Sequence, residues 1–233
     1  MLRCLFFLAG LAGLSAHATE LPLYLKDALS RFSPDIPPDL AYTITTQRAG
    51  ASSVERYDPS RPDERQWTLL QRDSRAATAE ENARLGSYRT TTAPSMHATF
   101  RRDDIDLNSL RLIREDANRA EFEGRFRDDT NDPLLQRLSL QLTVAKNPAA
   151  IEQCVLQLIG TFSPVLTVKM LELRVETTFS PPTAGRPALP RRVTSRFRGR
   201  VFLLKAIEED VQTVYSDFSQ VIPRPQPSAP PSP

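Results

Sequence analysis

The chain has 233 residues, of which 40% are hydrophobic and 25% are charged, and its formal net charge is +2. That length provides one sizeable domain with a hydrophobic core. A chain so close to neutral has no electrostatic reason to bind DNA, RNA or anionic lipid surfaces, so we predict no nucleic-acid partner.

The first eighteen residues have the pattern of a secretory signal peptide. Arg3 supplies a positive charge, the run from Leu5 to Leu14 is apolar, and Ala16-His17-Ala18 places small residues where a signal peptidase reads them. The apolar run is about half as long as a membrane-spanning helix, so we expect no stable membrane insertion. We predict cleavage after Ala18 and export to the periplasm.

The next segment is predicted to be a helix, and two clean strands follow further along the chain. Leu21–Phe32 carries apolar residues at helical spacing and is stopped by prolines. Arg119–Arg127 and Arg137–Val144 alternate apolar and polar residues, which predicts two adjacent antiparallel strands. The large residues of their apolar face are Phe122, Phe126, Leu140 and Leu142.

The rest of the chain extends this pattern into a sheet. Further strands are predicted at Ile151–Phe162, Val165–Phe179, Arg191–Leu204 and Val211–Phe218, with prolines between most of them. Thr78 and Glu81 form a capping-box pattern that predicts a short helix. We therefore predict the α+β class, with a large, curved, mostly antiparallel sheet and about three helices. One domain spans residues 19–222, and the proline-rich tail over 223–233 is predicted to be disordered.

Residues for catalysis are scarce. After cleavage His97 is the only histidine, in a polar segment that reads as a loop, and no G-x-S-x-G elbow accompanies it. Cys154 is then the only cysteine, among apolar neighbours that indicate a structural role. Zinc needs three or four ligands, and this one histidine and one cysteine are too few. The acidic run Asp103-Asp104-Asp106 lacks the glycine and the closing glutamate of a calcium-binding loop. We predict no enzyme activity, no cofactor and no metal.

What remains is the apolar face of the sheet, which can either close over a helix as a core or leave a cleft for an acyl chain. The parity of the strands places eight large residues on this face as the predicted ligand-binding set. They are Tyr42, Ile44, Trp67, Leu69, Phe122, Phe126, Leu140 and Leu142.

Three segments resemble a known family. The stretch Tyr57-Asp58-Pro59-Ser60-Arg61-Pro62, which continues through Trp67 to Thr78-Ala79-Glu80-Glu81, is similar to a stretch in exported proteobacterial proteins related to LolA-type periplasmic lipoprotein carriers. Arg198–Phe202 and Tyr215–Phe218 add to the resemblance, which covers roughly residues 23–221. It implies a half-open β-barrel lidded by helices, with an apolar cavity that holds the acyl chains of a lipoprotein in transit.

Two functions stay open at this point. The first is a carrier or binder of a lipidated or hydrophobic ligand, as in lipoprotein transport to the outer membrane. The second is an envelope sensor or protein-interaction module of the same fold, whose core is filled by its own side chains and whose partner is a protein. Arg61 either belongs to a structured turn before Trp67 or acts as the latch of a lid at the cavity mouth.

Overall fold

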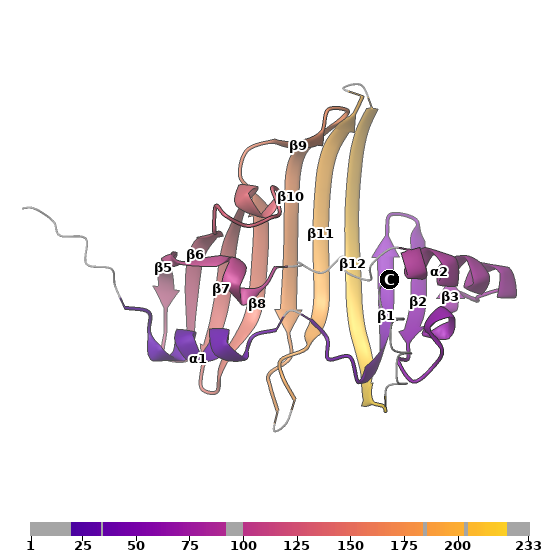
Figure 1. The fold of residues 1–233 in the computed structure, drawn as a ribbon, viewed down its shortest axis with the longest axis horizontal. Helices are drawn as coiled ribbons and strands as arrows, with labels where there is room; N and C mark the ends of the chain where they lie inside the picture. The colour runs from indigo at the N-terminus through magenta and orange to yellow at the C-terminus, as the bar shows by residue number, and fades with distance from the viewer. Residues whose placement is uncertain (1–19, 34, 92–99, 184–185, 203–204, 223–233) are drawn as a thin grey trace, which may run out of the picture.

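The computed structural model describes residues 20–33, 35–91, 100–183, 186–202 and 205–222. The predicted signal peptide, His97 and the proline-rich tail lie outside these ranges. Within them the protein is one large antiparallel sheet with two α-helices, so the predicted sheet-dominated α+β class is confirmed (Figure 1). About three helices were expected, and the described residues contain two.

The two α-helices are α1 (Leu23–Arg31) and α2 (Ala79–Thr91), and three short 3-10 helices are η1 (Asp63–Arg65), η2 (Arg102–Asp104) and η3 (Leu135–Arg137). The strands are β1 (Leu40–Arg48), β2 (Ala51–Tyr57), β3 (Trp67–Arg72), β4 (Arg75–Ala76), β5 (Ile105–Glu115), β6 (Arg119–Phe126), β7 (Leu138–Lys146), β8 (Ala149–Leu158), β9 (Phe162–Val165), β10 (Val168–Phe179), β11 (Pro190–Val201) and β12 (Lys205–Gln220).

The strand order is β4-β3-β2-β1-β12-β11-β10-β8-β7-β6-β5, and β9 pairs with β10 outside this path. The sheet is open, with β4 and β5 as its edges. Because β12 returns to pair with β1, the first and last strands of the chain lie at the middle of the sheet. Strands β10, β11 and β12 are the longest and extend beyond their neighbours at one end (Figure 1).

Two predicted strand boundaries were wrong. The segment Ile151–Phe162 does not form one strand, because β8 ends at Leu158 and Gly160 adopts a φ of 76° that turns the chain. Val165–Phe179 is likewise divided, since Val165 ends β9 and pairs with Val168 at the start of β10. A tight hairpin therefore stands where continuous strand was expected.

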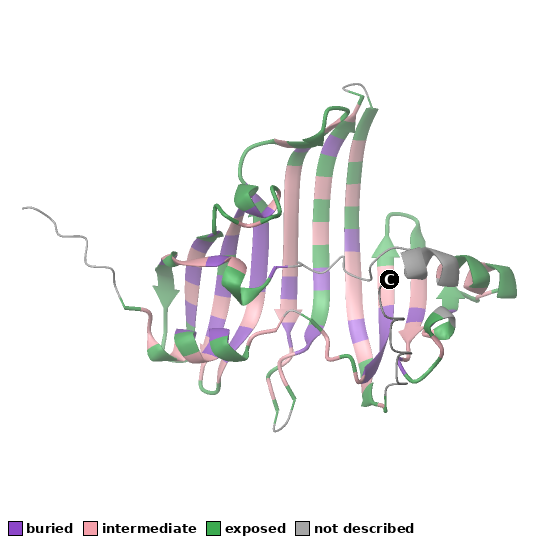
Figure 2. Ribbon diagram, in the orientation of Figure 1, coloured by how far each residue is buried: buried purple, intermediate pink, exposed green. Residues whose placement is uncertain are grey.

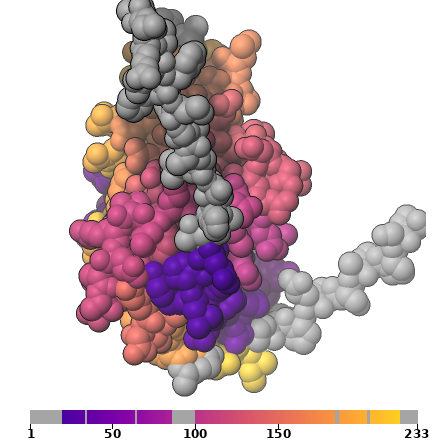
Figure 3. All heavy atoms as spheres, turned by 90° about the vertical axis from the view of Figure 1, so that its left-hand side faces the viewer, coloured from indigo at the N-terminus to yellow at the C-terminus, as the bar shows by residue number. Residues whose placement is uncertain are grey.

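Helix α1 forms as its spacing predicts. Leu25, Ala28 and Leu29 recur at three- and four-residue intervals and are its buried residues. The helix ends at Arg31, and Phe32 already has an extended backbone. Helix α1 packs mainly on β8 and β7, and the view from the β5 edge shows the helix seated against the neighbouring strands (Figure 3).

Candidate functional site

The eight residues predicted to line a cavity are all buried, and they do not meet in one place. Phe122, Phe126, Leu140 and Leu142 belong to a cluster beneath α1, which we call the α1 cluster. Tyr42, Ile44 and Trp67 belong to a second cluster. Leu69, 2% exposed, lies on β3, which contacts α2. Their exposed fractions range from 0% for Leu140 to 9% for Trp67.

The α1 cluster is packed as a core. Phe122 of β6 lies opposite Leu142 of β7, so the two predicted strands are adjacent and antiparallel, as expected. Leu25 and Leu29 of α1 pack onto this layer. Cys154 of β8 is also in the cluster, and burial raises the pKa of its thiol far above the usual range. The thiol is therefore a small packing group, as the sequence indicated.

The second cluster is aromatic and centres on Tyr42. Its ring centroid lies 5.1 Å from that of Tyr57, 6.0 Å from Trp67, 6.1 Å from Tyr215 and 5.8 Å from Phe218. Such distances are typical of favourable aromatic pairs. Two of the three segments that carry the family resemblance thus converge here, because Tyr57–Glu81 and Tyr215–Phe218 each contribute two rings, whereas Arg198–Phe202 contributes none. Burial above all, and then Asp63 and Asp58, raises the pKa of Tyr57.

Both clusters lie on the same face of the sheet. Residues directly opposite each other in antiparallel strands project to the same side. A continuous row of such pairs runs from the α1 cluster through the middle strands to β1; it comprises Phe122, Leu142, Cys154, Thr177, Val193, Thr213 and Thr46. Thr46 shares its side of β1 with Ile44 of the aromatic cluster. The helix-bearing face is therefore continuous between α1 and α2.

The middle of this face is formed by β10, β11 and β12, and we call it the central face. Its apolar and hydroxyl residues are Leu173, Val175, Val193, Ser195, Phe197 and Val211, with Thr213 next along β12. One charged residue, Glu209, lies opposite Phe197 on the same face and pairs with Arg48 of β1 at 3.0 Å. Val193 and Val211 are buried, while the others are half-buried. Val175 packs against both clusters. A Cβ at Gly199 would come within 2.7 Å of the Phe197 ring, so this ring lies along the sheet over Gly199.

The reverse side of the same strands is charged. Arg196 pairs with Asp210 at 3.0 Å, and Arg198 pairs with Glu208 at 2.7 Å. The alternation of buried and exposed positions is visible along β11 (Figure 2). Strands were predicted here, but none of the central-face residues is among the eight predicted to bind a ligand. The signal was the same alternation, in Val165–Phe179 and Arg191–Leu204, that identified the two clean strands.

Arg61 lies in a turn. Its Nε is 3.3 Å from Asp58 Oδ2, and its Nη1 donates to Thr68 Oγ1 at 3.2 Å. Asp58 also accepts hydrogen bonds from the backbone and hydroxyl of Ser60, and the hydroxyl bond is the main reason that its pKa is lowered. The contacts of Arg61 therefore join the turn to β3, which corresponds to the first of the two roles considered for it.

Helix α2 is anchored at its first turn. Glu81 N–H donates to Thr78 Oγ1 at 3.2 Å and Thr78 N–H donates to Glu81 Oε2 at 2.9 Å, so the predicted capping box is present. Asn82 binds the backbone of Leu69 twice, accepting from its N–H at 2.7 Å and donating to its carbonyl at 3.1 Å. Leu85 packs against the aromatic cluster. These contacts fix α2 over β3.

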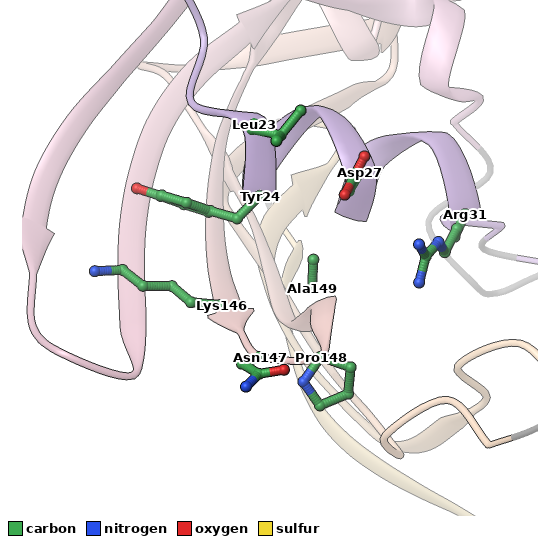
Figure 4. Close-up of a pocket in the computed structure, with 8 residues that line it drawn as sticks. All are labelled: Leu23, Tyr24, Asp27, Arg31, Lys146, Asn147, Pro148 and Ala149. Atoms are coloured by element: carbon green, nitrogen blue, oxygen red, sulfur yellow. The ribbon is translucent and has the colours of Figure 1, made fainter.

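A groove of about 410 Å³ lies beside α1 and the β7–β8 turn, lined by Leu23, Tyr24, Asp27, Arg31, Lys146, Asn147, Pro148 and Ala149 (Figure 4). Two of its polar groups, Tyr24 and Lys146, meet at the carboxylate of Glu115 on β5. Tyr24 donates to Glu115 at 2.9 Å, and Lys146 lies 2.8 Å from the same carboxylate and 5.5 Å from the Tyr24 ring. Burial and Glu115 raise the pKa of Tyr24 to about 12. These polar contacts beside the groove therefore hold α1 against the sheet.

The described residues bring together no group of three or more histidine, cysteine or acidic side chains that could hold a metal ion. In the same part of the chain, no helix is both long and apolar enough to cross a membrane. Comparison of the chain with protein-family models, with curated proteins and with solved structures found no match. The geometry of the sheet is therefore the basis for assigning a function.

Proposed function

We propose that the protein is a non-enzymatic periplasmic carrier that binds a hydrophobic or acylated ligand on the helix-bearing face of a half-barrel sheet. The observation that carries this proposal is the central face. It is apolar and only half-buried at Leu173, Val175 and Phe197, although the reverse side of the same strands carries ion pairs. An apolar sheet face of this kind requires an apolar layer against it.

The chemistry of the central face suits an acyl chain. Most of its side chains are aliphatic or aromatic, Ser195 and Thr213 place single hydroxyl groups among them, and the charge of Glu209 at its edge is paired with Arg48. Ligand pockets typically combine an apolar lining with a few such polar groups. Each buried methylene of an acyl chain contributes about 0.8 kcal/mol. A chain lying across β10–β12 could therefore bind tightly and without covalent chemistry.

A second candidate function is an envelope sensor or protein-interaction module with a filled core. The observation that favours it is the packing of the α1 cluster, where Leu140 is 0% exposed and Leu142 1%. In this case the central face is covered by protein, and no lipid accompanies the molecule. The two functions therefore differ in whether an acyl probe reaches the central face.

Two neighbouring residues provide a matched test. Ser195 is half-buried on the central face, whereas Thr194 is exposed on the reverse side of the same strand. Replacing either by aspartate adds the same carboxylate on opposite faces. A carboxylate among apolar groups loses hydration when an acyl chain covers it, and this costs several kcal/mol. We expect Ser195→Asp to weaken binding of a fluorescent fatty-acyl probe at least tenfold and Thr194→Asp to leave it unchanged.

Native mass spectrometry of the protein purified from its own host supplies the second measurement. The carrier proposal predicts a co-purified acyl compound that is lost in Ser195→Asp and kept in Thr194→Asp. Melting temperatures of both variants check that each remains folded. A wild-type chain that binds no acyl probe and carries no lipid would refute the carrier and support the filled module. Equal effects of the two substitutions would reject the central face as the site.

A further inference from the structure

The far end of the longest strands carries exposed apolar side chains on two adjacent hairpin turns. Leu166 is 98% exposed, Phe202 69% and Val165 56%. Leu166 follows β9, and Phe202 follows β11. Phe202 N–H donates to the carbonyl of Thr167 at 2.7 Å, so the two turns lie side by side. We call these three residues the apolar tip; they lie at the end of the sheet where β10–β12 extend beyond their neighbours (Figure 1).

Three large hydrophobic side chains exposed together, as in the tip, are unusual on a protein surface. A large hydrophobic residue alone on a surface is common, but several together on adjacent turns indicate a contact surface. Phe202 also has a φ of 51°, a region that favours glycine or asparagine over a bulky aromatic residue. Phe202 forms the turn directly after β11, and its side chain stays exposed. Neither the packing nor the turn geometry accounts for an aromatic residue at this position.

Basic residues surround the tip. Lys169, Arg200 and Lys205 are all exposed, and they are the only charged residues in the segments 161–171 and 199–207. In the described part of the chain, no ion pair joins any of the three to an acidic side chain. The nearest acids in the sequence, Glu172 and Glu208, both pair with Arg198. The tip thus carries three formal positive charges, although the whole chain has a net charge of only +2.

The register places these charges on both sides of the sheet. Lys169 lies directly opposite Arg200 in the β10–β11 pair, an arrangement of like charges that is unfavourable within a sheet. Lys205 lies opposite Val201 and therefore projects to the other face. The cations consequently flank the apolar tip from both directions. Along the strands they lie about 3–7 Å behind it, since Lys169 follows the Val165–Val168 pair and Arg200 is two residues before Phe202.

We propose that this end of the sheet docks on an anionic lipid surface, with Val165, Leu166 and Phe202 entering the outer part of the bilayer and Lys169, Arg200 and Lys205 at the level of the headgroups. An apolar group inserted 5–10 Å and a basic group at the interface are the two components of peripheral membrane binding. A second copy of the chain fits less well, because two tips of the same charge repel. The proposal is independent of what binds to the central face.

Flotation with phosphatidylcholine vesicles, with and without phosphatidylglycerol, tests the proposal on the full chain. We expect binding to the anionic vesicles and weaker binding to the neutral ones, with a decrease at high salt. Each basic residue near an anionic surface contributes about fivefold to affinity. The triple variant Lys169→Gln/Arg200→Gln/Lys205→Gln should therefore bind about a hundredfold less tightly. The control is Arg191→Gln/Arg192→Gln, which removes two positive charges at the opposite end of β11 and should bind like the wild type.

The apolar tip has its own variant and control. Leu166→Ser/Phe202→Asn removes two exposed side chains and gives position 202 a residue that tolerates positive φ, so the fold should be retained. We expect about a tenfold loss or more in vesicle affinity, and no loss for Leu23→Ser, which removes a leucine that is 74% exposed on α1. Failure of the wild type to bind anionic vesicles would overturn the proposal. So would equal losses in control and tip variants, or tip variants that change only the oligomeric state in size-exclusion chromatography.

Discussion

We predict that helix α1 is a fixed part of the hydrophobic core and not a mobile lid. The substitution Leu29→Ala tests this prediction. Leu29 is 1% exposed and packs into the α1 cluster with Leu25 and Ala28. Leu→Ala at a fully buried position costs about 3–5 kcal/mol, from lost burial and from the cavity left behind. Domains of this kind unfold with about 5–15 kcal/mol, so Leu29→Ala should remove a large share of the stability. A fall of about 10 °C in melting temperature follows.

The same helix supplies the control. Leu23 is 74% exposed, so Leu23→Ala should change the free energy of unfolding by less than about 0.5 kcal/mol. Urea titration of both variants, followed by far-UV circular dichroism, measures the difference. If Leu29→Ala were no more costly than Leu23→Ala, α1 would not belong to the cooperative core. A faster entry of an acyl probe in Leu29→Ala, at unchanged stability, would instead identify α1 as a mobile lid.

Three further predictions concern α2 and the buried thiol. Asn82→Ala leaves the N–H and carbonyl of Leu69 without their side-chain partner and should cost about 1–3 kcal/mol in urea titration, whereas Arg84→Ala, whose partner is the exposed Glu80, should cost little. The bidentate bond from Arg75, and then the N–H of Thr78, lower the pKa of Glu81 to about 2. Because this pKa is below the unfolded value, the contribution of Glu81 to stability is complete above about pH 4.5 and is lost as the pH falls towards 2. An NMR titration of the Glu81 carboxyl carbon measures this pKa, and an ordinary value would contradict the capping box. In a Cys4→Ser chain, Cys154 should react with a thiol reagent only at the rate of unfolding, and rapid labelling of the folded protein would show that the α1 cluster opens.

Sequence alone predicted much of the local structure, although it missed the β9–β10 hairpin. The spacing of Leu25, Ala28 and Leu29 predicts α1, the alternation around Phe122 and Leu140 predicts β6 and β7, and the pair Thr78 and Glu81 predicts the start of α2. These patterns work because each depends on residues that are close in the chain. Side chains on one face recur every 3.6 residues in a helix and every two in a strand. The buried face of an element can therefore be predicted without knowing which element packs against it.

The arrangement of the strands was decided only by the tertiary structure. Parity correctly indicated that Tyr42, Trp67 and Phe122 face inwards, but it did not indicate that the first two are in one cluster and the third in another. That division follows from the pairing of β12 with β1, which inserts the long central strands between the two groups. Pairing between segments about 170 residues apart leaves no local signature in either of them.

The central face and the apolar tip have the same origin. Val175, Ser195 and Val211 form one row because of the registers of β10, β11 and β12, and a shift of one residue would turn each side chain to the other face. Likewise, the net charge of +2 gave no sign of the three cations around Leu166 and Phe202. Composition determines how many apolar and charged groups the chain contains. Only the register of strands distant in sequence determines which of them lie together.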